Sequence, residues 1–307
     1  MKIDQSLLEK FELGLDPQNP AASTVKCNLI GFGEISAIFE VEGMEGMAMK
    51  RLPIFPDRST AEQYIKLYDE YCVLLDNAGI RLPETATALV EVPGRPVVIY
   101  IAQDRLPTDR FCNKLIHVWE MREIKKLIQS VVEQFKAIWR FTESRKPGLD
   151  IAIDGQLSNW VVSGSCYDYT LDYIDTSTPF IRRNGKHQIP ADLFLQAVPR
   201  HLRGIFRSLF LSDVLNRYYD RRSILLDLAA NLYKEQRPDL VPVAVQVIND
   251  SIGRMAEPVT VEAVNRYYRE DKMIWTIFLA IRKLDRWAAT TIRHGRYEFI
   301  LPEKIKR

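Results

Sequence analysis

The sequence contains few cysteines and no close cysteine pair. Its four cysteines, Cys27, Cys72, Cys112 and Cys166, are widely spaced and form no C-x-x-C motif. Because structural zinc sites and disulfide frameworks rely on repeated, close cysteine spacings, this pattern disfavours both kinds of site. We therefore expect a protein of a reducing compartment, the cytoplasm.

The sequence also lacks a long apolar run and an excess of charge of one sign. No stretch approaches the ~20 apolar residues that span a bilayer. The opening residues, MKIDQSLLEKFELG, carry acids where a signal peptide has an apolar core. The formal net charge of +2 gives no reason to expect nucleic acid as a partner. With 307 residues, 47% hydrophobic, the chain can form one large folded domain or two smaller ones.

The character of the sequence changes along its length. Residues 1–25 have the pattern of a short amphipathic helix followed by a loop. Residues 26–106 contain glycines and strand-like segments, interrupted by one helical segment. Residues 107–307 are mainly helical in pattern, apart from a strand-like stretch at 151–175. A small β-rich part followed by a larger helical part predicts a two-lobed α+β fold.

Two glycines lie in the strand–turn–strand segment IGFGEISAIFEV. Gly31, Gly33 and Ser36 form the pattern G-x-G-x-x-S. Glycine lets a backbone approach a ligand closely, and such a turn can lay its amides along phosphate oxygens. A strand follows the turn, which disfavours a Rossmann dinucleotide-binding turn, in which a helix follows. An ordinary hairpin turn is the alternative.

A lysine and a glutamate downstream form a second candidate pair. Lys50 lies in the strand-like segment GMAMKRL, where a solvated edge lysine is the alternative. The next helix is predicted to begin at an S-x-x-E capping box, Ser59 and Glu62. Its apolar face is predicted to contain Tyr64, Leu67, Tyr71 and Leu74. Glu70 falls on or beside that face, and a carboxylate turned toward a core needs a partner, for which Lys50 is the candidate.

A third candidate pair lies in the segment DIAIDGQLSNW, which precedes a predicted strand. Asp154 and Asn159 are five positions apart in it. Both residue types are common in turns, because their short side chains bond back to the nearby backbone. A structural turn is therefore the alternative to a functional site here.

In this order, the motifs resemble those of the protein-kinase-like superfamily, and within it those of the aminoglycoside phosphotransferase and choline kinase branch. The resemblance covers about residues 26–180. It implies a protein-kinase-like fold with a small β-rich N-lobe and a larger, mainly helical C-lobe, and it implies ATP and Mg²⁺ as cofactors. The implied nucleotide-binding residues are Gly31, Gly33 and Ser36 over the phosphates, Lys50 on the α- and β-phosphates, Glu70 orienting Lys50, and Ile101 and Gln103 in an adenine-reading connector at 97–104.

The resemblance also assigns roles in the C-lobe. Asp154 would be the catalytic-loop aspartate. Asn159 and Asp175 would hold Mg²⁺, with Asp172 as a second choice for the metal aspartate. Ala152 stands where the family has a histidine or its equivalent, and no arginine precedes Asp154. No A-P-E segment is present, so a protein kinase is disfavoured.

The predicted function is transfer of the γ-phosphate of ATP to a hydroxyl group of a small molecule. Residues 190–300 are rich in basic and aromatic residues, which favours an anionic or aromatic acceptor. Amphipathic helices with solvated arginines are the alternative explanation of that composition. The second hypothesis is an inactive kinase-like protein that works as a nucleotide-binding scaffold or regulator, because Ala152 and the pair Thr176–Ser177 depart from the family pattern.

Overall fold

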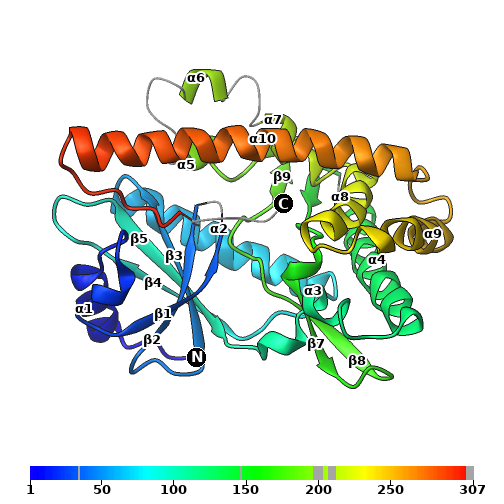
Figure 1. Ribbon diagram of the computed structural model, residues 1–307, viewed down its shortest axis with the longest axis horizontal. Helices are drawn as coiled ribbons and strands as arrows, with labels where there is room; N and C mark the ends of the chain where they lie inside the picture. The colour runs from blue at the N-terminus through cyan, green and yellow to red at the C-terminus, as the bar shows by residue number, and fades with distance from the viewer. Residues whose placement is uncertain (34, 146, 196–202, 207–211, 302–307) are drawn as a thin grey trace.

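The computed structural model of the chain describes residues 1–33, 35–145, 147–195, 203–206 and 212–301. The N-terminal part is built around a β-sheet, and the C-terminal part is mainly helical (Figure 1). The predicted α+β class, with its small β-rich lobe and larger helical lobe, is confirmed. Within the described residues, no helix is both long and apolar enough to cross a membrane.

The N-lobe contains a five-stranded antiparallel sheet. Its strands are β1 (Cys27–Phe32), β2 (Ala37–Val41), β3 (Met47–Phe55), β4 (Thr85–Val90) and β5 (Val97–Asp104). The spatial order is β1-β2-β3-β5-β4. Strand β5 pairs with β3 on one side and with β4 on the other, so its backbone hydrogen-bonding groups are used within the sheet.

A helix covers each face of this sheet. Helix α1 (Gln5–Gly14) packs Leu8 and Phe11 against Phe39 and Tyr100 on one face. Helix α2 (Arg58–Asn77) lies against the other face and is capped by Asp57, whose side chain accepts a hydrogen bond from the amide of Thr60. The predicted start at a Ser59–Glu62 capping box is therefore wrong, because an aspartate two residues earlier already serves as the cap.

Successive side chains of β3 point to opposite faces of the sheet, as in any strand. Arg51 lies on the α1 face, where its guanidinium binds Glu12 of α1 through two hydrogen bonds of 2.7 Å. It also contacts Glu298, 2.8 Å away, in the segment that follows the last helix. The segment after α10 (Val261–Trp287) therefore returns to the N-lobe, where the ion pair between Glu298 and the buried Arg51 holds it.

The C-lobe is built around long helices. Its helices are α3 (Cys112–Leu115), α4 (Met121–Ser144), α5 (Ala191–Leu195), α6 (Arg203–Phe206), α7 (Ser212–Arg217), α8 (Arg221–Lys234), α9 (Val241–Ile252) and α10 (Val261–Trp287). Helix α4 packs against α9, and α8 packs against both α9 and α10. The buried apolar stripe of α4 includes Val131, Phe135 and Ile138 and forms the centre of this core.

Short strands of the C-lobe carry the segment between Asp154 and Asp175. Strand β6 (Leu149–Ile151) pairs with β9 (Ile181–Arg183), which pairs with β10 (Lys186–His187). Strands β7 (Trp160–Gly164) and β8 (Tyr169–Tyr173) form a hairpin. The loop after β6 and the chain after β8 border the same cavity as β3 of the N-lobe sheet.

Candidate active site between the lobes

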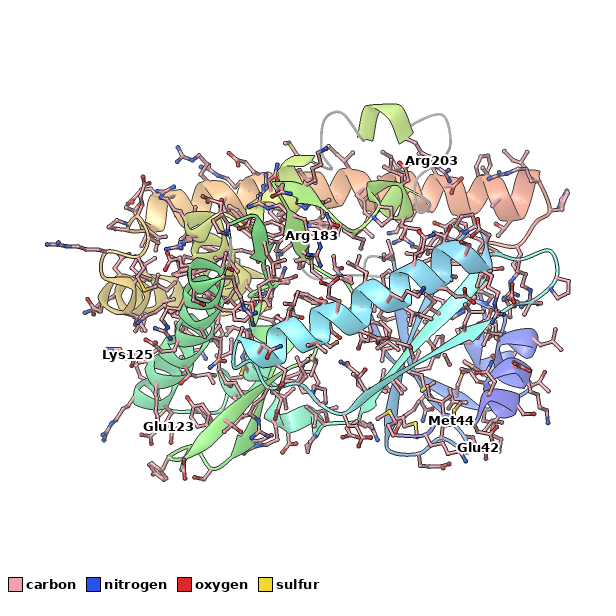
Figure 2. All side chains as sticks on the ribbon, turned by 180° about the vertical axis from the view of Figure 1, so that it is seen from behind. Glu42, Met44, Glu123, Lys125, Arg183 and Arg203 are labelled. Carbon is pink, nitrogen blue, oxygen red and sulfur yellow. The ribbon has the colours of Figure 1, made fainter. Side chains whose placement is uncertain are left out.

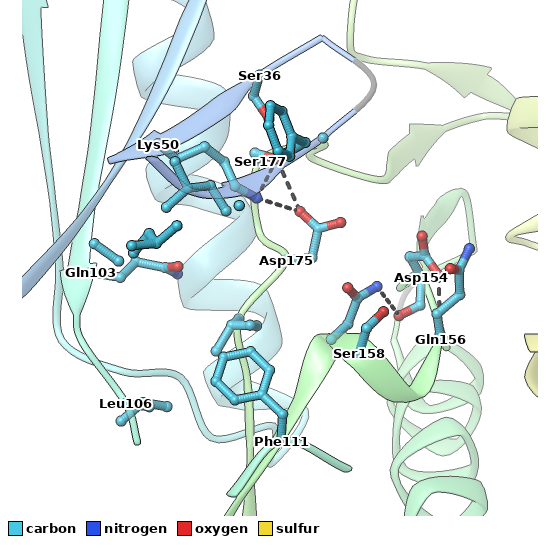
Figure 3. Close-up of a pocket in the computed structure, with 18 of the residues that line it drawn as sticks. Ser36, Lys50, Gln103, Leu106, Phe111, Asp154, Gln156, Ser158, Asp175 and Ser177 are labelled. Atoms are coloured by element: carbon cyan, nitrogen blue, oxygen red, sulfur yellow. Dashed lines mark hydrogen bonds and ion pairs between the residues drawn. The ribbon is translucent and has the colours of Figure 1, made fainter. Parts of the chain in front are cut away.

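A cavity of about 330 Å³ lies between the two lobes (Figure 3). Its walls come from the β1–β2 turn, β3, the chain after β5, the loop after β6 and the chain after β8. Most of the predicted site residues line it, namely Gly31, Gly33, Ser36, Lys50, Gln103, Asp154, Asn159 and Asp175. Glu70 and Ile101 are not among the lining residues.

The glycine segment forms the roof of this cavity. The amide of Gly33 donates a hydrogen bond of 2.9 Å to the carbonyl of Ser36, which closes the turn between β1 and β2. A Cβ atom at Gly33 would collide with the hydroxyl of Ser36, so a larger residue here would require that hydroxyl to move. The exposed side chain of Phe32 also lines the cavity.

Lys50 and Asp175 form an ion pair in the wall of the cavity (Figure 3). The ammonium of Lys50 lies 2.7 Å from a carboxylate oxygen of Asp175 and 3.0 Å from the hydroxyl of Ser177. Burial alone would raise the pKa of Asp175, but the charge and hydrogen bond of Lys50 outweigh it and hold that pKa below its usual value. The cavity therefore contains an ionised carboxylate beside a fixed cation.

Glu70 is not the partner of Lys50, which corrects the sequence prediction. Its carboxylate forms an ion pair with Arg183, at the end of β9, which Figure 2 labels near α2. The buried face of α2 contains Tyr64, Tyr68 and Tyr71. The prediction placed Leu67 rather than Tyr68 on that face, and this rotation of about one residue moved Glu70 toward the core.

The predicted adenine contact at Ile101 is also wrong. Ile101 is 1% exposed, and it pairs with Lys50 on one side and with Thr87 on the other. Because an inner strand has no free backbone groups, it cannot read a base. The cavity wall comes instead from Gln103 and the chain after β5, which contributes Asp104, Arg105, Leu106, Thr108 and Phe111.

The segment with Asp154 is a turn that also faces the cavity. The carboxylate of Asp154 accepts a hydrogen bond of 3.1 Å from the amide of Gln156, as a turn aspartate does. The amide of Ile174 donates a hydrogen bond of 3.0 Å to the carbonyl of Asn159. That bond ties the end of the Asp154 turn to the end of β8, directly before Asp175. Asp154 can therefore stabilise the turn and also face the cavity as a functional residue.

Asp154 lies in an unusual electrostatic environment. Burial raises the pKa of its carboxyl group well above the usual value, and the nearby carboxylates of Asp227 and Asp175 raise it further. Asp227 belongs to α8 and is itself buried. A carboxyl group with a raised pKa holds a proton more readily at neutral pH than an ordinary aspartate does.

A second, small cavity of about 30 Å³ lies on the far side of Asp154. Asp154 and Gln156 line both cavities. The other lining residues come from the helical lobe: Arg217, Tyr218, Asp227, Tyr267, Asp271, Ile274 and Trp275. Lys234 lies 3.0 Å from Asp271 and partly balances the carboxylates. Asp154 and Gln156 therefore lie between the two cavities.

Sequence reasoning missed several lining residues. Ser158 and Ser177 stand within or beside predicted motifs, so a search of the motif neighbours could have found them. Phe111 lies only a few residues beyond the predicted connector. Asp227 and Asp271 had no local signal, because they lie within helices far from Asp154 in sequence.

Two oxygen-bearing side chains that line the cavity, Asp175 and Asn159, could take part in a metal site. In the part of the chain that the structure describes, no group of three or more His, Cys, Asp or Glu side chains is arranged to hold a metal. Mg²⁺ commonly takes one or two protein oxygen ligands and completes its shell with water and phosphate oxygens. Asp175 and Asn159 supply such oxygens, whereas Asp172 is bonded to Arg81, 3.1 Å away, and to Ser163.

Comparison with known proteins assigns a family. Residues 25–286 match a family of unknown function (DUF6206). The chain belongs to this family. No curated protein sequence matches the chain.

Two solved structures are similar to this family member over much of its length. WaaP in complex with acyl carrier protein is 13% identical, with a TM-score of 0.34, and the match covers 73% of this chain and 89% of that chain. The GDP complex of wild-type aminoglycoside 2'-phosphotransferase-IIIa is 10% identical, with a TM-score of 0.37, and the match covers 81% of this chain and 98% of that chain.

Proposed function

We propose that the protein is an ATP-dependent phosphotransferase that transfers the γ-phosphate to a hydroxyl group of a small molecule. The observation that carries this proposal is the gathering of Lys50, Asn159, Asp154 and Asp175 around one cavity under a glycine turn. Phosphoryl transfer requires mainly positioning and charge neutralisation, and these residues offer both.

The two charged groups at the centre of the cavity would bind Mg·ATP. Lys50 would leave Asp175 and neutralise the α- and β-phosphates, as a compact cation on a flexible stem can. Asp175 and Asn159 would hold Mg²⁺, which when bound neutralises the charge that develops on the transferred group. The apolar side chains of Leu106 and Phe111 would contact the base.

Asp154 would accept the proton of the acceptor hydroxyl or orient that hydroxyl. A general base works best when its pKa lies near the working pH, and burial moves the pKa of Asp154 in that direction. The turn bond to Gln156 fixes the carboxylate without satisfying all of its lone pairs. An acceptor that enters from the second cavity would therefore contact the carboxylate of Asp154, which also lines the proposed nucleotide cavity.

The second cavity supports an aromatic contact but not an anionic acceptor. Tyr267 and Trp275 provide ring surfaces. Three carboxyl groups outnumber the two cations here, namely Asp154, Asp227 and Asp271 against Arg217 and Lys234. Like charge near an anion is costly, so a neutral or cationic group fits better next to the acceptor hydroxyl. A cavity of about 30 Å³ has room for a hydroxyl group, so the body of a larger acceptor must displace a lining side chain.

The test compares phosphate release from ATP by the wild-type chain and by Asp154→Asn. We expect release to fall by roughly two to four orders of magnitude, with unchanged Mg·ATP affinity, because only the proton acceptor is lost. Asp168→Asn, an exposed change outside the cavity, is the matched control. Equal rates in all three proteins would contradict the proposal, and Mg·ATP binding without any turnover would favour the scaffold hypothesis.

A further inference from the structure

Helix α2 presents tyrosines to the site where a carboxylate was expected. Tyr64, Tyr68 and Tyr71 occur at spacings of four and three residues, so they lie on one face of the helix. Each is at most 2% exposed. A buried phenol needs a hydrogen-bond partner. Each of the three has a partner in the functional segments, and the hydroxyl of Tyr68 also lies 2.7 Å from the hydroxyl of Thr85 on β4.

Two of the phenols contact the residues that follow Asp175. The hydroxyl of Tyr64 donates a hydrogen bond of 2.7 Å to the carbonyl of Ser177. The hydroxyl of Tyr68 lies 3.2 Å from the hydroxyl of Thr176. Thr176 is 1% exposed and also accepts a hydrogen bond of 3.3 Å from the side chain of Gln103. The chain after Asp175 is therefore held from α2 and from β5.

The third phenol contacts the other functional segment. The hydroxyl of Tyr71 donates a hydrogen bond of 2.7 Å to the carbonyl of Ala152, two residues before Asp154. Ala152 in turn donates its amide to the carbonyl of Phe180. One helix thus reaches both segments, but through different tyrosines.

These phenols can position a segment without adding charge to it. Burial raises the pKa values of Tyr64 and Tyr71 well above their usual value, so both stay protonated hydrogen-bond donors over the working pH range. A carboxylate at the same place would compete with Asp175 for Lys50. Neutral donors leave Asp175 as the carboxylate that faces Lys50 in this structure.

We propose that the tyrosine face of α2 (Tyr64, Tyr68 and Tyr71) positions the site in two parts. Tyr64 and Tyr68 position the Asp175 segment, which sets the binding of the metal–nucleotide complex. Tyr71 positions the Asp154 loop, which sets the rate of transfer. This inference rests on the proposed function, and it concerns positioning residues that do not touch the substrate.

The test compares Tyr64→Phe with Tyr71→Phe in the full chain. Each change removes one hydroxyl from a buried hydrogen bond, a loss that corresponds to about a tenfold effect. For Tyr64→Phe we expect KM for Mg·ATP to rise about tenfold with kcat nearly unchanged. For Tyr71→Phe we expect kcat to fall about tenfold with KM nearly unchanged. Tyr169→Phe, which removes a part-buried hydroxyl 3.1 Å from the hydroxyl of Ser130 and outside the cavity, is the control.

A second measurement separates this inference from the proposed function. Hydrogen exchange of the ligand-free chain should be faster at residues 174–178 in Tyr64→Phe and at residues 152–156 in Tyr71→Phe. Faster exchange without any Mg·ATP binding by the wild-type chain would overturn the proposed function but keep the positioning. Wild-type activity together with unchanged exchange, KM and kcat in both variants would overturn the positioning alone. Equal changes in KM and kcat in both variants would overturn the division into two parts.

Discussion

Lys50 and Arg51 are neighbours on β3, yet their ion pairs lie on opposite faces of the sheet and differ in how far they are exposed to solvent. The side chains of Arg51 and Glu12 are 2% and 0% exposed, and Glu298 and Tyr100 complete that cluster. The side chains of Lys50 and Asp175 are 12% and 30% exposed and border a cavity. Strand alternation alone separates them. We propose that the buried ion pair stabilises the fold, whereas the ion pair that borders the cavity exchanges one partner for a ligand.

The largest expected effect comes from breaking the buried pair. Arg51→Met should lower the free energy of unfolding by ~3–5 kcal/mol, because it removes both guanidinium hydrogen bonds to the buried Glu12, whose contact with Arg95 is longer, at 3.8 Å. Lys50→Met should cost far less stability, since Asp175 remains in contact with solvent, but it should abolish turnover. Urea unfolding of both variants measures the difference. Similar losses of stability in the two variants would contradict the division between a structural and a functional pair.

The two exposed ion pairs of Arg58, with Glu62 and with Glu91, supply a control for that experiment. Arg58→Met should change the free energy of unfolding by ~0–1 kcal/mol, as surface ion pairs do. A loss close to that of Arg51→Met would mean that removal of any arginine destabilises the chain, whatever its burial.

Asp154 offers a second comparison, with Asp175, through the pH dependence of stability. The pKa of Asp154 is raised in the folded chain, first by burial and then by Asp227 and Asp175. Its ionisation therefore opposes folding as pH rises above ~3.9, the usual pKa of aspartate. Asp154→Asn should raise the melting temperature at pH 7, and the gain should vanish below about pH 4. The pKa of Asp175 is lowered mainly by Lys50 against the effect of burial, so Asp175→Asn should show the opposite pH dependence.

Thermal unfolding from pH 3 to pH 8 tests both directions in one experiment. A melting temperature of Asp154→Asn equal to or below that of the wild-type chain at pH 7 would contradict the raised pKa. In that case Asp154 would be an ordinary turn residue whose charge is well solvated.

The smallest expected effect is that of Glu70. Its ion pair with Arg183 is partly exposed and lies outside the cavity. Glu70→Gln should change the free energy of unfolding by ~0–1 kcal/mol and leave ATP turnover unchanged. A large loss of turnover would restore the sequence prediction that Glu70 orients Lys50.

Much of the site could be predicted from the sequence because its residues sit in local motifs. Lys50, Asp154 and Asn159 are assigned to a site by the resemblance of the motif order to a known superfamily, and the structure brings them to one cavity with Asp175. Glu70 was misplaced because a helix face is defined only to within about one residue when tyrosines and leucines alternate along it.

The missing parts of the prediction depend on contacts between distant segments. Ile101 belongs to an inner strand, and strand order is set by pairing that no local pattern reveals. The second cavity combines Asp154 with residues of α8 and α10. Arg51 meets one carboxylate from the first helix and another from the C-terminal segment. Only the folded chain brings such residues together.

The most direct measurement is the thermal shift produced by ATP with Mg²⁺, by ATP alone and by Mg²⁺ alone. A ligand at 100 times its dissociation constant should stabilise the chain by ~2.7 kcal/mol. We predict a shift that needs ATP and Mg²⁺ together, that Asp175→Asn abolishes, and that Asp172→Asn retains, because Asp172 is bonded to Arg81 and Ser163 rather than facing the cavity. The absence of any shift in the wild-type chain, or an undiminished shift in Asp175→Asn, would contradict a metal–nucleotide site between the lobes.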